Sequence, residues 1–378
     1  MTSSSFRLIY AASDQCADML YATGFSAPDE FLWFETDTET CVVVSSLEYG
    51  RAVKTVKPGI VVMTPEQAME RFAGGGDENY PKTVDIVAAV TASRSIDAWT
   101  VPASFPFGMV EKLRERGVGL KVMSPFFESR SCKTADEIAH LREGVVLAEK
   151  GLQAGIELLR DAVAGDDGIL FFEGEALTSE RVRGEIDAVI MRSGGLPKNT
   201  IVAGGVQGAD PHEVGRGALR VSEPIVIDVF PRVLRTGYFG DLTRTVVKGE
   251  VPGVARRAWE AVAAAQDAAT ETIAPGVSCR EVHETAAEVL QKHGFETGDG
   301  DSGPFGFIHG LGHGLGLEIH EAPRLSSRSA EVLKPGMVVT VEPGLYYPEW
   351  GGVRLENVVA VTDSGADVLT TIPRELMV

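Results

Sequence analysis

The N-terminal third of the chain alternates between short apolar runs and segments of helical periodicity. Thr40–Val44, Val84–Val90 and Leu120–Met123 are rich in β-branched or apolar residues and predict strands. Thr64–Phe72 and Met109–Arg116 predict helices between them. This alternation is typical of an open α/β layer. Histidines and carboxylates are not concentrated here, so we expect this part to have a supporting role.

The pattern changes near residue 130. Thr134 followed by Glu137 is a capping box, in which each side chain satisfies a free backbone N–H at the start of a helix. A long amphipathic helix is predicted from there, because apolar residues recur mostly at steps of three and four: Ile138, Leu141, Val145, Leu152, Ile156 and Leu159. We place a domain boundary just before it, between residues 1–128 and 129–378.

The second part of the chain shows an internal repeat. The long helix and a second helix precede a pair of strands, and another pair of helices precedes another pair of strands. The second helix is predicted over Glu175–Arg192, the later helices over Val254–Thr272 and Cys279–His293, and the strands over Glu223–Phe230, Asp241–Lys248, Gly336–Glu342 and Gly352–Val361. The last helix also opens with a capping box, from Ser278 to Glu281.

Each predicted strand pair carries two acids at nearly the same separation. They are Asp228 and Asp241 in the first pair, and Glu342 and Glu356 in the second. A hairpin with a central loop brings such positions side by side, so two facing hairpins would gather four carboxylates. Four unrelated surface acids are the alternative. That alternative is weakened because each acid interrupts an apolar strand, where a charge is costly unless it is paired or bound to a metal.

Three of the seven histidines fall within Phe307–Glu321, which reads FIHGLGHGLGLEIHE. Its glycines leave room for backbone or ligand to approach the imidazoles. His313 and His320 are separated by an odd number of residues and would face opposite sides of a straight strand, unless the glycines allow a bend. We therefore expect one or two of His309, His313 and His320 to be metal ligands.

Carboxylates and imidazole suit Mn²⁺, Co²⁺, Fe²⁺ or Zn²⁺. Four carboxylates around one ion would repel each other, whereas two divalent ions would neutralise them. Such a pair clamps a water molecule, lowers its pKa and polarises a carbonyl, which predicts hydrolysis of an amide or ester. The sequence lacks HExxH, GxSxG and GxxxxGK[ST], so a one-zinc helical protease, a serine hydrolase and a P-loop protein are disfavoured.

Composition and charge limit the kinds of binding partner and the cellular location that we expect. Hydrophobic residues make up 44% and charged residues 24%, which is typical of a globular protein. The formal charge of −19 disfavours binding to nucleic acid or an anionic membrane surface. A run of about 20 apolar residues, the length that spans a membrane, does not occur. Four scattered cysteines without a CxxC pair favour inert thiols in a reducing cytoplasm.

These motifs together resemble the superfamily of methionine aminopeptidase, prolidase, aminopeptidase P and creatinase. The matching segments are IVIDVF, YFGDLTRT, HGLGHGLGLEIHE, VEPG and GVRLEN, and LYATGFSAPDEFL (Leu20–Leu32) is similar to a motif of the creatinase-type N-terminal domain. The resemblance implies a mixed α/β (α+β) protein. Residues 1–128 would form a smaller α/β creatinase-like domain, and residues 129–378 a catalytic pita-bread domain with a pseudo-two-fold repeat.

The resemblance also implies roles for individual residues. Asp241 and Glu356 would bridge two divalent ions, Asp228 would complete one, and His313 and Glu342 the other. A hydroxide bridging the ions would attack the peptide carbonyl, and Glu342 would carry its proton to the leaving amine. The remaining catalytic or substrate-side residues implied by the resemblance are His212, His309, His320 and Arg354.

The function implied is hydrolysis of an N-terminal Xaa-Pro bond in dipeptides, as in prolidase, or in longer peptides, as in aminopeptidase P. The complete ligand set argues against creatinase, and the N-terminal domain argues against methionine aminopeptidase. A homodimer acting on small peptides is expected from the resemblance alone. A metal-dependent lyase or amidohydrolase acting on a small non-peptide substrate is the second hypothesis, and a binding protein without activity is the third.

Two departures from the family pattern bear on these expectations. The step from Asp228 to Asp241 is longer than in the best-known members, with the insertion in the loop PRVLRTG. Asn357 stands where many relatives have an acid after the last glutamate. The first departure is expected to change the rim of the site, and the second the charge behind it.

Overall fold

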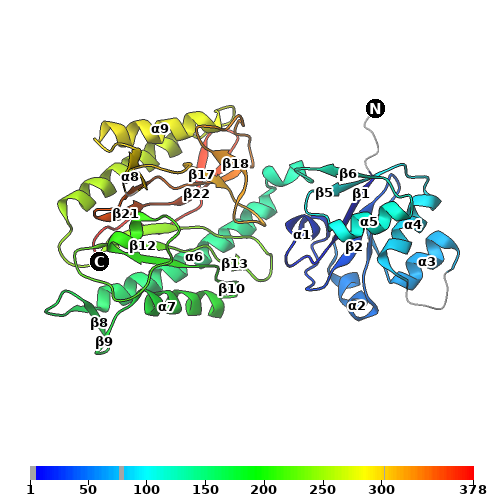
Figure 1. Ribbon diagram of the computed structural model, residues 1–378, viewed down its shortest axis with the longest axis horizontal. Coiled ribbons are helices and arrows are strands. Elements are labelled where there is room, and N and C mark those ends of the chain that lie inside the picture. Colours follow the sequence, from blue (N-terminus) through cyan, green and yellow to red (C-terminus); the bar gives the residue numbers. More distant parts are fainter. Residues whose placement is uncertain (1–5, 76–80, 302) are drawn as a thin grey trace. The chain divides into compact units, whose positions relative to one another are not determined.

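The computed structural model describes residues 6–75, 81–301 and 303–378 and divides the chain into two compact units, Met1–Arg130 and Ser131–Val378. Figure 1 shows the elements of both units. The mixed α/β class predicted from the sequence is confirmed. The assignment of residues 1–128 and 129–378 to a creatinase-like and a catalytic domain stays a prediction.

The first unit is a six-stranded sheet covered by helices on both faces. The strand order is β4-β3-β2-β1-β5-β6, with antiparallel and parallel pairs mixed. Two separate apolar clusters lie on its two faces, one with residues of α3, α4 and α5 and the other with residues of α1 and α2. The elements are β1 Arg7–Ala11, α1 Ala17–Thr23, β2 Phe31–Glu35, β3 Thr40–Val43, α2 Ser46–Thr55, β4 Ile60–Met63, α3 Pro65–Ala73, α4 Thr83–Ser93, β5 Trp99–Pro102, α5 Phe107–Glu115 and β6 Leu120–Met123.

One predicted strand of this unit is wrong. Val84–Val90 lies inside the helix α4, where Val84, Val87 and Val90 are buried at three-residue spacing against the sheet. A short apolar run without polar alternation cannot be assigned to helix or strand by periodicity alone. In this protein, tertiary packing of residues 84–90 against the sheet favours the helix.

The first helix of the second unit is the long helix α6. Thr134 and Glu137 form both hydrogen bonds of the predicted capping box. The helices are α6 Ala135–Asp161, α7 Ser179–Arg192, α8 Gly253–Thr272 and α9 Cys279–Lys292. The strands are β7 Val163–Ala164, β8 Leu170–Phe172, β9 Glu175–Ala176, β10 Gly195–Leu196, β11 Ile201–Gly204, β12 Pro224–Asp228, β13 Arg232–Val233, β14 Thr243–Val247, β15 Gly298–Gly300, β16 Gly303–Phe305, β17 Gly312–Gly314, β18 Glu321–Leu325, β19 Val338–Val341, β20 Gly344–Tyr347, β21 Gly351–Arg354, β22 Asn357–Val361 and β23 Ala366–Val368.

The predicted repeat is visible in how these elements are arranged. Helices α6 and α7 pack together beside the sheet β11-β12-β14, and helices α8 and α9 pack together beside the sheet β18-β17-β19-β22-β23 (Figure 1). β12 pairs with β14, and β19 pairs with β22, both in antiparallel register. The two helix pairs therefore flank two strand pairs, and the site is built where these strand pairs end.

The last predicted strand requires a correction. Gly352–Val361 is not one strand but two, β21 and β22, with Leu355 and Glu356 between them. β21 pairs with β20, while β22 pairs with β19. The backbone N–H of Glu356 instead donates to Thr243 O at 3.0 Å, which joins the two strand pairs. The break between β21 and β22 thus allows the backbone of Glu356, a predicted metal ligand, to bond to the other strand pair.

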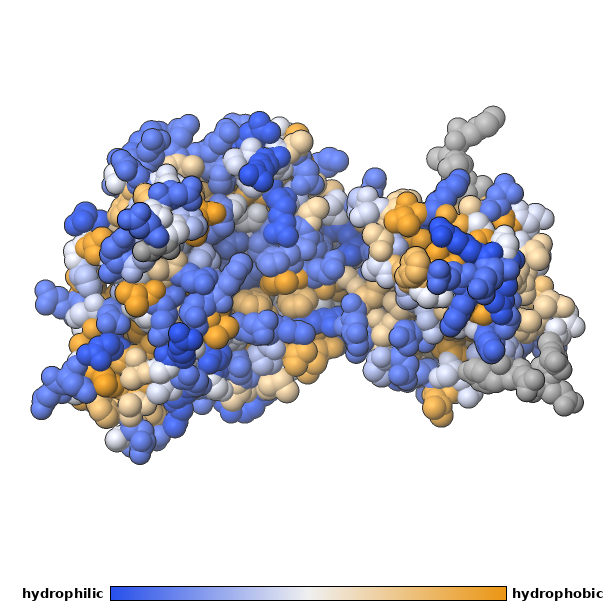
Figure 2. Space-filling view, viewed as in Figure 1, coloured by the Kyte–Doolittle hydropathy of each residue, from blue (hydrophilic) through white to orange (hydrophobic). Residues whose placement is uncertain are grey.

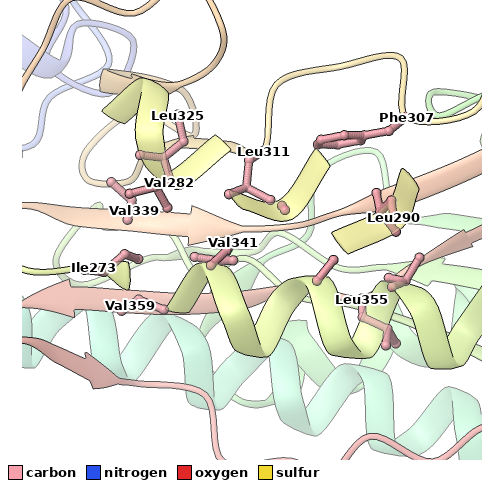
Figure 3. Packing of buried hydrophobic residues seen from close by; sticks show 14 of the residues in the cluster. Ile273, Val282, Leu290, Phe307, Leu311, Leu325, Val339, Val341, Leu355 and Val359 are labelled. Carbon is pink, nitrogen blue, oxygen red and sulfur yellow. The ribbon is translucent and has the colours of Figure 1, made fainter. Parts of the chain in front are cut away.

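The core of the second half of this unit lies between α8, α9 and the sheet. Val339, Val341 and Val359 of the sheet pack against helix residues such as Val282 and Leu290 (Figure 3). All five are fully buried. Burial of these side chains fixes β19 and β22, and so the residues at their ends.

The face shown in Figure 2 carries many hydrophilic side chains, with hydrophobic ones among them. This agrees with the large acid excess of the chain. Within the described residues, every helix is too short or too polar to cross a lipid bilayer.

Candidate metal centre

All residues singled out from the sequence for catalysis or metal binding line one cavity of the second unit. Its volume is about 670 Å³. The walls include apolar side chains, among them Ile201, Phe230, Ile308 and Ile319. The predicted residues in its lining are His212, Asp228, Asp241, His309, His313, His320, Glu342, Arg354 and Glu356.

Strand pairing brings the four acids to one place. Asp228 ends β12 and lies opposite Thr243, so Asp241, just before β14, returns beside it. Val341 lies opposite Asn357, so Glu342 and Glu356 extend the same register by one residue. Asp241 and Glu356 are 5% and 2% exposed. The hairpin geometry proposed from the sequence therefore describes both strand pairs.

His313 lies on β17, at a bulge between His313 and Gly314. Its backbone N–H donates to Thr340 Oγ1 at 3.0 Å. Nδ1 lies 3.2 Å from Gly314 O, which can only accept, so Nδ1 carries a proton and Nε2 faces the acids. Nε2 lies 3.3 Å from Glu342 Oε1 and 3.6 Å from Asp241 Oδ2. This is the tautomer in which Nε2 can bind a cation.

Burial makes the carboxylates resist ionisation. Burial raises the pKa of Asp241 well above its usual range, and the charges of Glu356 and Asp228 raise it further. Glu356 behaves in the same way, with Glu342 and Asp228 as its negative neighbours. Burial also raises the pKa of Asp228, against the opposing effect of Arg354. A group of acids with raised pKa values needs positive charge to be ionised at neutral pH.

Glu342 is the exception among the four acids. Burial alone would raise its pKa, but in the metal-free site a His313 ring protonated also at Nε2 donates to Glu342 and, followed by His309 and Arg354, lowers this pKa to about 2. Its Oε1 also accepts from Thr340 Oγ1 at 3.2 Å. Glu342 is therefore ionised at neutral pH and can accept a proton.

Arg354 and Tyr346 form a buried chain of hydrogen bonds behind the acids. Arg354 Nη2 donates to Asp228 Oδ2 at 2.7 Å, and Nη1 donates to Tyr346 Oη at 2.9 Å. His309 Nδ1 lies 2.6 Å from Gly310 O, so Nδ1 donates and Nε2 accepts from Tyr346 Oη at 2.9 Å. Both ring nitrogens of His309 are thus engaged within the protein, which favours a positioning role over direct contact with substrate.

His212 and His320 line the cavity from two exposed loops. The His320 ring lies edge-on to the His313 ring, with centroids 4.4 Å apart. The bulge at His313 and the turn that follows bring the two rings together despite their odd spacing. Partial burial, the His313 ring and Arg324 lower the pKa of His320 to about 4, so its imidazole is neutral at neutral pH.

The donor set fits a divalent cation. Asp241, His313 and Glu356 each offer a ligand atom, and these atoms all lie within 4.8 Å of one another. Two buried carboxylate oxygens, Asp228 Oδ1 and Glu356 Oε1, have no hydrogen-bond partner. A buried carboxylate oxygen without a donor is costly, and a bound cation would satisfy it. Asp228 and Glu342 line the same cavity but lie outside this closest group; Arg354 donates to Asp228 and Thr340 donates to Glu342.

Several residues that shape the site were not singled out in the sequence. Thr243 Oγ1 donates to Glu356 Oε2 at 2.7 Å, and Thr340 supports both His313 and Glu342. Tyr346 links Arg354 to His309, and Arg324 lines the cavity. Thr243 belongs to the segment YFGDLTRT quoted above, and this was the one sequence signal for its role in the site. Hydroxyl and aromatic residues in apolar strands are otherwise expected to be ordinary core residues.

The two departures from the family pattern lie behind the site or away from it. Residues 231–237 of the inserted loop form a tight hairpin turn, in which Gly237 N donates to Val233 O, and none of them lines the cavity. The expected change in the rim is therefore not seen at these residues. Asn357 accepts from the buried Arg244 Nη2 at 3.0 Å, where an acid would supply a negative charge.

A close helix contact sets the position of Asp241. Gly144 of α6 packs against the backbone of Phe239 and Gly240, and a Cβ at Gly144 would lie 2.5 Å from Phe239 O. Gly144→Ala is therefore expected to displace residues 239–241. We expect at least a tenfold loss of metal affinity and destabilisation of about 1–3 kcal/mol from overpacking. Calorimetric metal titration and thermal unfolding measure the two effects.

Gly184→Ala in α7 is the matched control, because a Cβ there meets nothing within 4 Å. It should leave metal affinity unchanged and keep or slightly raise stability, as alanine favours helix over glycine. Equal metal affinity in the Gly144→Ala variant and the native protein would refute the contact as a determinant of the site.

The fold and the buried donor set define a class of protein, a metal-dependent hydrolase with its site at the end of two strand pairs. Residues 139–363 match the model of metallopeptidase family M24. The chain is 34% identical over 284 residues to a Xaa-Pro dipeptidase of Pyrococcus furiosus, covering 73% of this chain and 74% of that one. The chain belongs to metallopeptidase family M24.

Solved structures agree in fold over nearly the whole chain. A prolidase from Pyrococcus furiosus matches with a TM-score of 0.78 and 29% identity, covering 98% of each chain. An X-Pro aminopeptidase from Thermotoga maritima matches with a TM-score of 0.82, covering 99% of this chain and 98% of that one, but its 22% identity bears on the fold alone. Both kinds of peptidase named from the sequence resemblance therefore occur among the structural neighbours.

Proposed function

We propose that this protein is a metal-dependent peptidase that hydrolyses the bond between an N-terminal residue and proline, with dipeptides as its main substrates. The observation that carries the proposal is the convergence of Asp228, Asp241, His313, Glu342 and Glu356 in one cavity. Family M24 membership and the named activity of the Pyrococcus furiosus relative support it. The predicted location in the cytoplasm and the predicted homodimer rest on the sequence alone.

We propose that these five residues hold two divalent ions, and that Mn²⁺, Co²⁺, Fe²⁺ and Zn²⁺ all suit the donors. When bound, such ions would activate water and polarise the scissile carbonyl. Glu342, ionised at neutral pH, accepts the proton of the attacking water at a carboxylate oxygen and passes it to the leaving nitrogen. His320 or His212 donates an N–H to the oxyanion that develops on the substrate.

Arg354 and Tyr346 hold the acids rather than the substrate. Arg354 is 4% exposed and its guanidinium donates to Asp228, Thr243 and Tyr346. Burial raises the pKa of Tyr346 to about 12, so its hydroxyl stays neutral and can donate to His309. These contacts fix the direction in which Asp228 presents its free oxygen.

Arg324 supplies a reason to favour dipeptides. Arg324 lies opposite His313 in the β17–β18 pair, so both side chains project from the same face, and it is exposed while lining the cavity. A guanidinium at this wall can pair with the free carboxylate of a dipeptide, which a longer peptide or an amidated dipeptide lacks there.

Arg324→Ala is therefore expected to lower kcat/KM for a Xaa-Pro dipeptide by about 10- to 100-fold, the effect of losing a charge-assisted hydrogen bond of about 1.5–3 kcal/mol. Hydrolysis of the same dipeptide with an amidated C-terminus should change much less. Arg328→Ala, which removes an exposed arginine outside the cavity lining, is the control. An equal loss on both substrates would show that Arg324 does not read the carboxylate.

A substrate panel tests the function itself. The protein is dialysed against chelator, reloaded with Mn²⁺, Co²⁺ or Zn²⁺, and offered Xaa-Pro dipeptides, Xaa-Pro-Yaa tripeptides and dipeptides without proline. Hydrolysis mainly of Xaa-Pro dipeptides supports the proposal. Preference for the tripeptides would assign aminopeptidase P-type action instead. Metal binding without hydrolysis of any peptide would overturn the peptidase proposal in favour of a non-peptide substrate.

A further inference from the structure

A buried ion pair lies beside the cavity, outside the set of residues that the mechanism uses. Lys133 Nζ lies 3.2 Å from Glu321 Oε2, and the two side chains are 1% and 7% exposed. Lys133 precedes the capping box of α6, and Glu321 opens β18, far away in the sequence. A charged pair buried this deeply contributes little net stability compared with apolar residues. Stability alone therefore does not explain the pair, and its contacts indicate which groups it could position.

The carboxylate of Glu321 organises the turn that carries His320. Glu321 Oε1 accepts the backbone N–H of Glu318 at 3.0 Å, which closes the turn. Gly316 packs directly on this carboxylate, since a Cβ there would lie 2.7 Å from Glu321 Oε1. His320 is the residue immediately before Glu321 and stands edge-on to His313.

Lys133 ties this turn to the segment that leads to Glu342. Its backbone N–H donates to Gly336 O at 2.7 Å, and Gly336 N donates to Val361 O at 2.9 Å. Gly336 precedes β19, and Glu342 directly follows that strand. The backbone of Lys133 is therefore fixed to the segment that leads into β19, and its ammonium group reaches the turn that carries His320.

We propose that the Lys133–Glu321 pair positions His320, holding its imidazole beside His313 where it can donate to the substrate oxyanion. Lys133 and Glu321 act through His320 and do not contact the substrate themselves. The inference rests on the proposed function for its kinetic consequence, because His320 is given a substrate contact there. Its geometric part, the place of the His320 ring, stands without that function.

The test combines Lys133→Met with His320→Ala in a double-mutant cycle. In the native background, Lys133→Met should lower kcat/KM for a Xaa-Pro dipeptide about 10- to 100-fold, the scale of a small misplacement of a catalytic group. In the His320→Ala background, the same substitution should cost less than about two-fold, because the group it positions is gone. Lys292→Met, which removes an exposed Lys–Glu pair on α9, should have no effect in either background.

The His320 imidazole gives a second measurement that does not depend on activity. Its ring resonances, assigned by their loss in His320→Ala, should shift in Lys133→Met while those of His140 and His293 stay in place. If Lys133→Met does not fold because Glu321 is left charged and buried, Lys133→Met/Glu321→Gln keeps an acceptor for Glu318 N–H and removes the buried charge. The double variant should fold and retain the kinetic loss.

Equal losses in the two backgrounds, or unchanged His320 resonances in a folded variant, would overturn the positioning role. A lower unfolding temperature with unchanged kcat/KM would do the same and leave a purely structural pair. If the native, metal-loaded protein hydrolyses no peptide, the proposed function fails, and the ring resonances still decide whether the pair positions His320.

Discussion

Replacing Glu342 by glutamine or alanine is expected to abolish peptide hydrolysis while the fold survives. Glu342 is the one acid of the cluster whose pKa is lowered, to about 2, so its carboxylate is ionised at neutral pH, the form that a proton shuttle requires. Loss of a general base usually costs about 10²–10⁴-fold in rate, and Glu342 is also a proposed metal ligand. We therefore expect kcat to fall by at least about 10³-fold with the dipeptide and Mn²⁺ at saturation.

The same substitution should lower the stability of the metal-free protein at neutral pH. The pKa of Glu342 is lowered from its ordinary 4.5 to about 2 in the folded protein, so its ionised form contributes stability above about pH 4.5 that glutamine cannot supply. Relief of the repulsion on Asp228, Asp241 and Glu356 offsets part of this loss. Glu342→Gln keeps the size of the side chain and avoids a cavity, so the metal-free variant is expected to fold and to unfold somewhat below the native temperature.

Elemental analysis separates the two roles of Glu342. An inactive Glu342→Gln variant that retains both ions has lost proton transfer, whereas one that has lost an ion has lost a ligand. Glu349→Gln, an exposed acid in the following hairpin, is the matched control and should keep full activity. Turnover within tenfold of the native rate in a metal-loaded Glu342→Gln variant would contradict the proposed role.

The convergence of the acids could be anticipated because local patterns encode it. An acid at the end of an apolar strand, such as Glu342, can be predicted to be buried. Antiparallel pairing of the two strands then predicts that Glu342 lies near Glu356. Neither step needs knowledge of distant parts of the chain. The set of five metal ligands nonetheless stays a prediction until metal is measured, since the structure brings only Asp241, His313 and Glu356 into a closest group.

What the sequence could not supply depends on contacts between distant segments. Val84–Val90 became a helix because of how it packs on the sheet, and its composition gives no sign of this. Tyr346 lies in a run that reads as an ordinary buried strand, yet it bridges Arg354 and His309. The place of His320 follows from a bulge and a buried carboxylate, which no periodicity rule detects.

Replacing Asp241 by asparagine is expected to have opposite effects on stability with and without metal. The pKa values of Asp241 and Glu356 in the folded protein lie well above the ordinary 3.8 and 4.5, mainly because of burial. Between those ordinary values and the raised ones, the folded state binds more protons than the unfolded state. The free energy of unfolding of the metal-free protein therefore falls as the pH rises from about 4.

Asp241→Asn removes one of these titrating groups and its repulsion of Glu356. The metal-free variant should lose less stability than the native protein as the pH rises. At neutral pH it should unfold about 2–4 °C higher, which corresponds to roughly 1 kcal/mol in a unit of this size. Asp363→Asn, an exposed acid in the turn after β22, should leave the metal-free pH dependence unchanged.

Adding Mn²⁺ should reverse the order of the two proteins. An ion that binds only the folded state stabilises it by about 2.7 kcal/mol at a hundred times its dissociation constant, and the ionised carboxylates favour this binding at higher pH. The native protein should gain this stability, while Asp241→Asn, with an amide in place of the carboxylate, should gain little and hydrolyse no dipeptide. Thermal unfolding across pH, with chelator and with Mn²⁺, measures the stability of both proteins without and with metal. Equal stabilisation of the two proteins by Mn²⁺ would remove Asp241 from the ligand set, because a residue that binds the ion cannot be replaced without loss of the linkage between metal and folding.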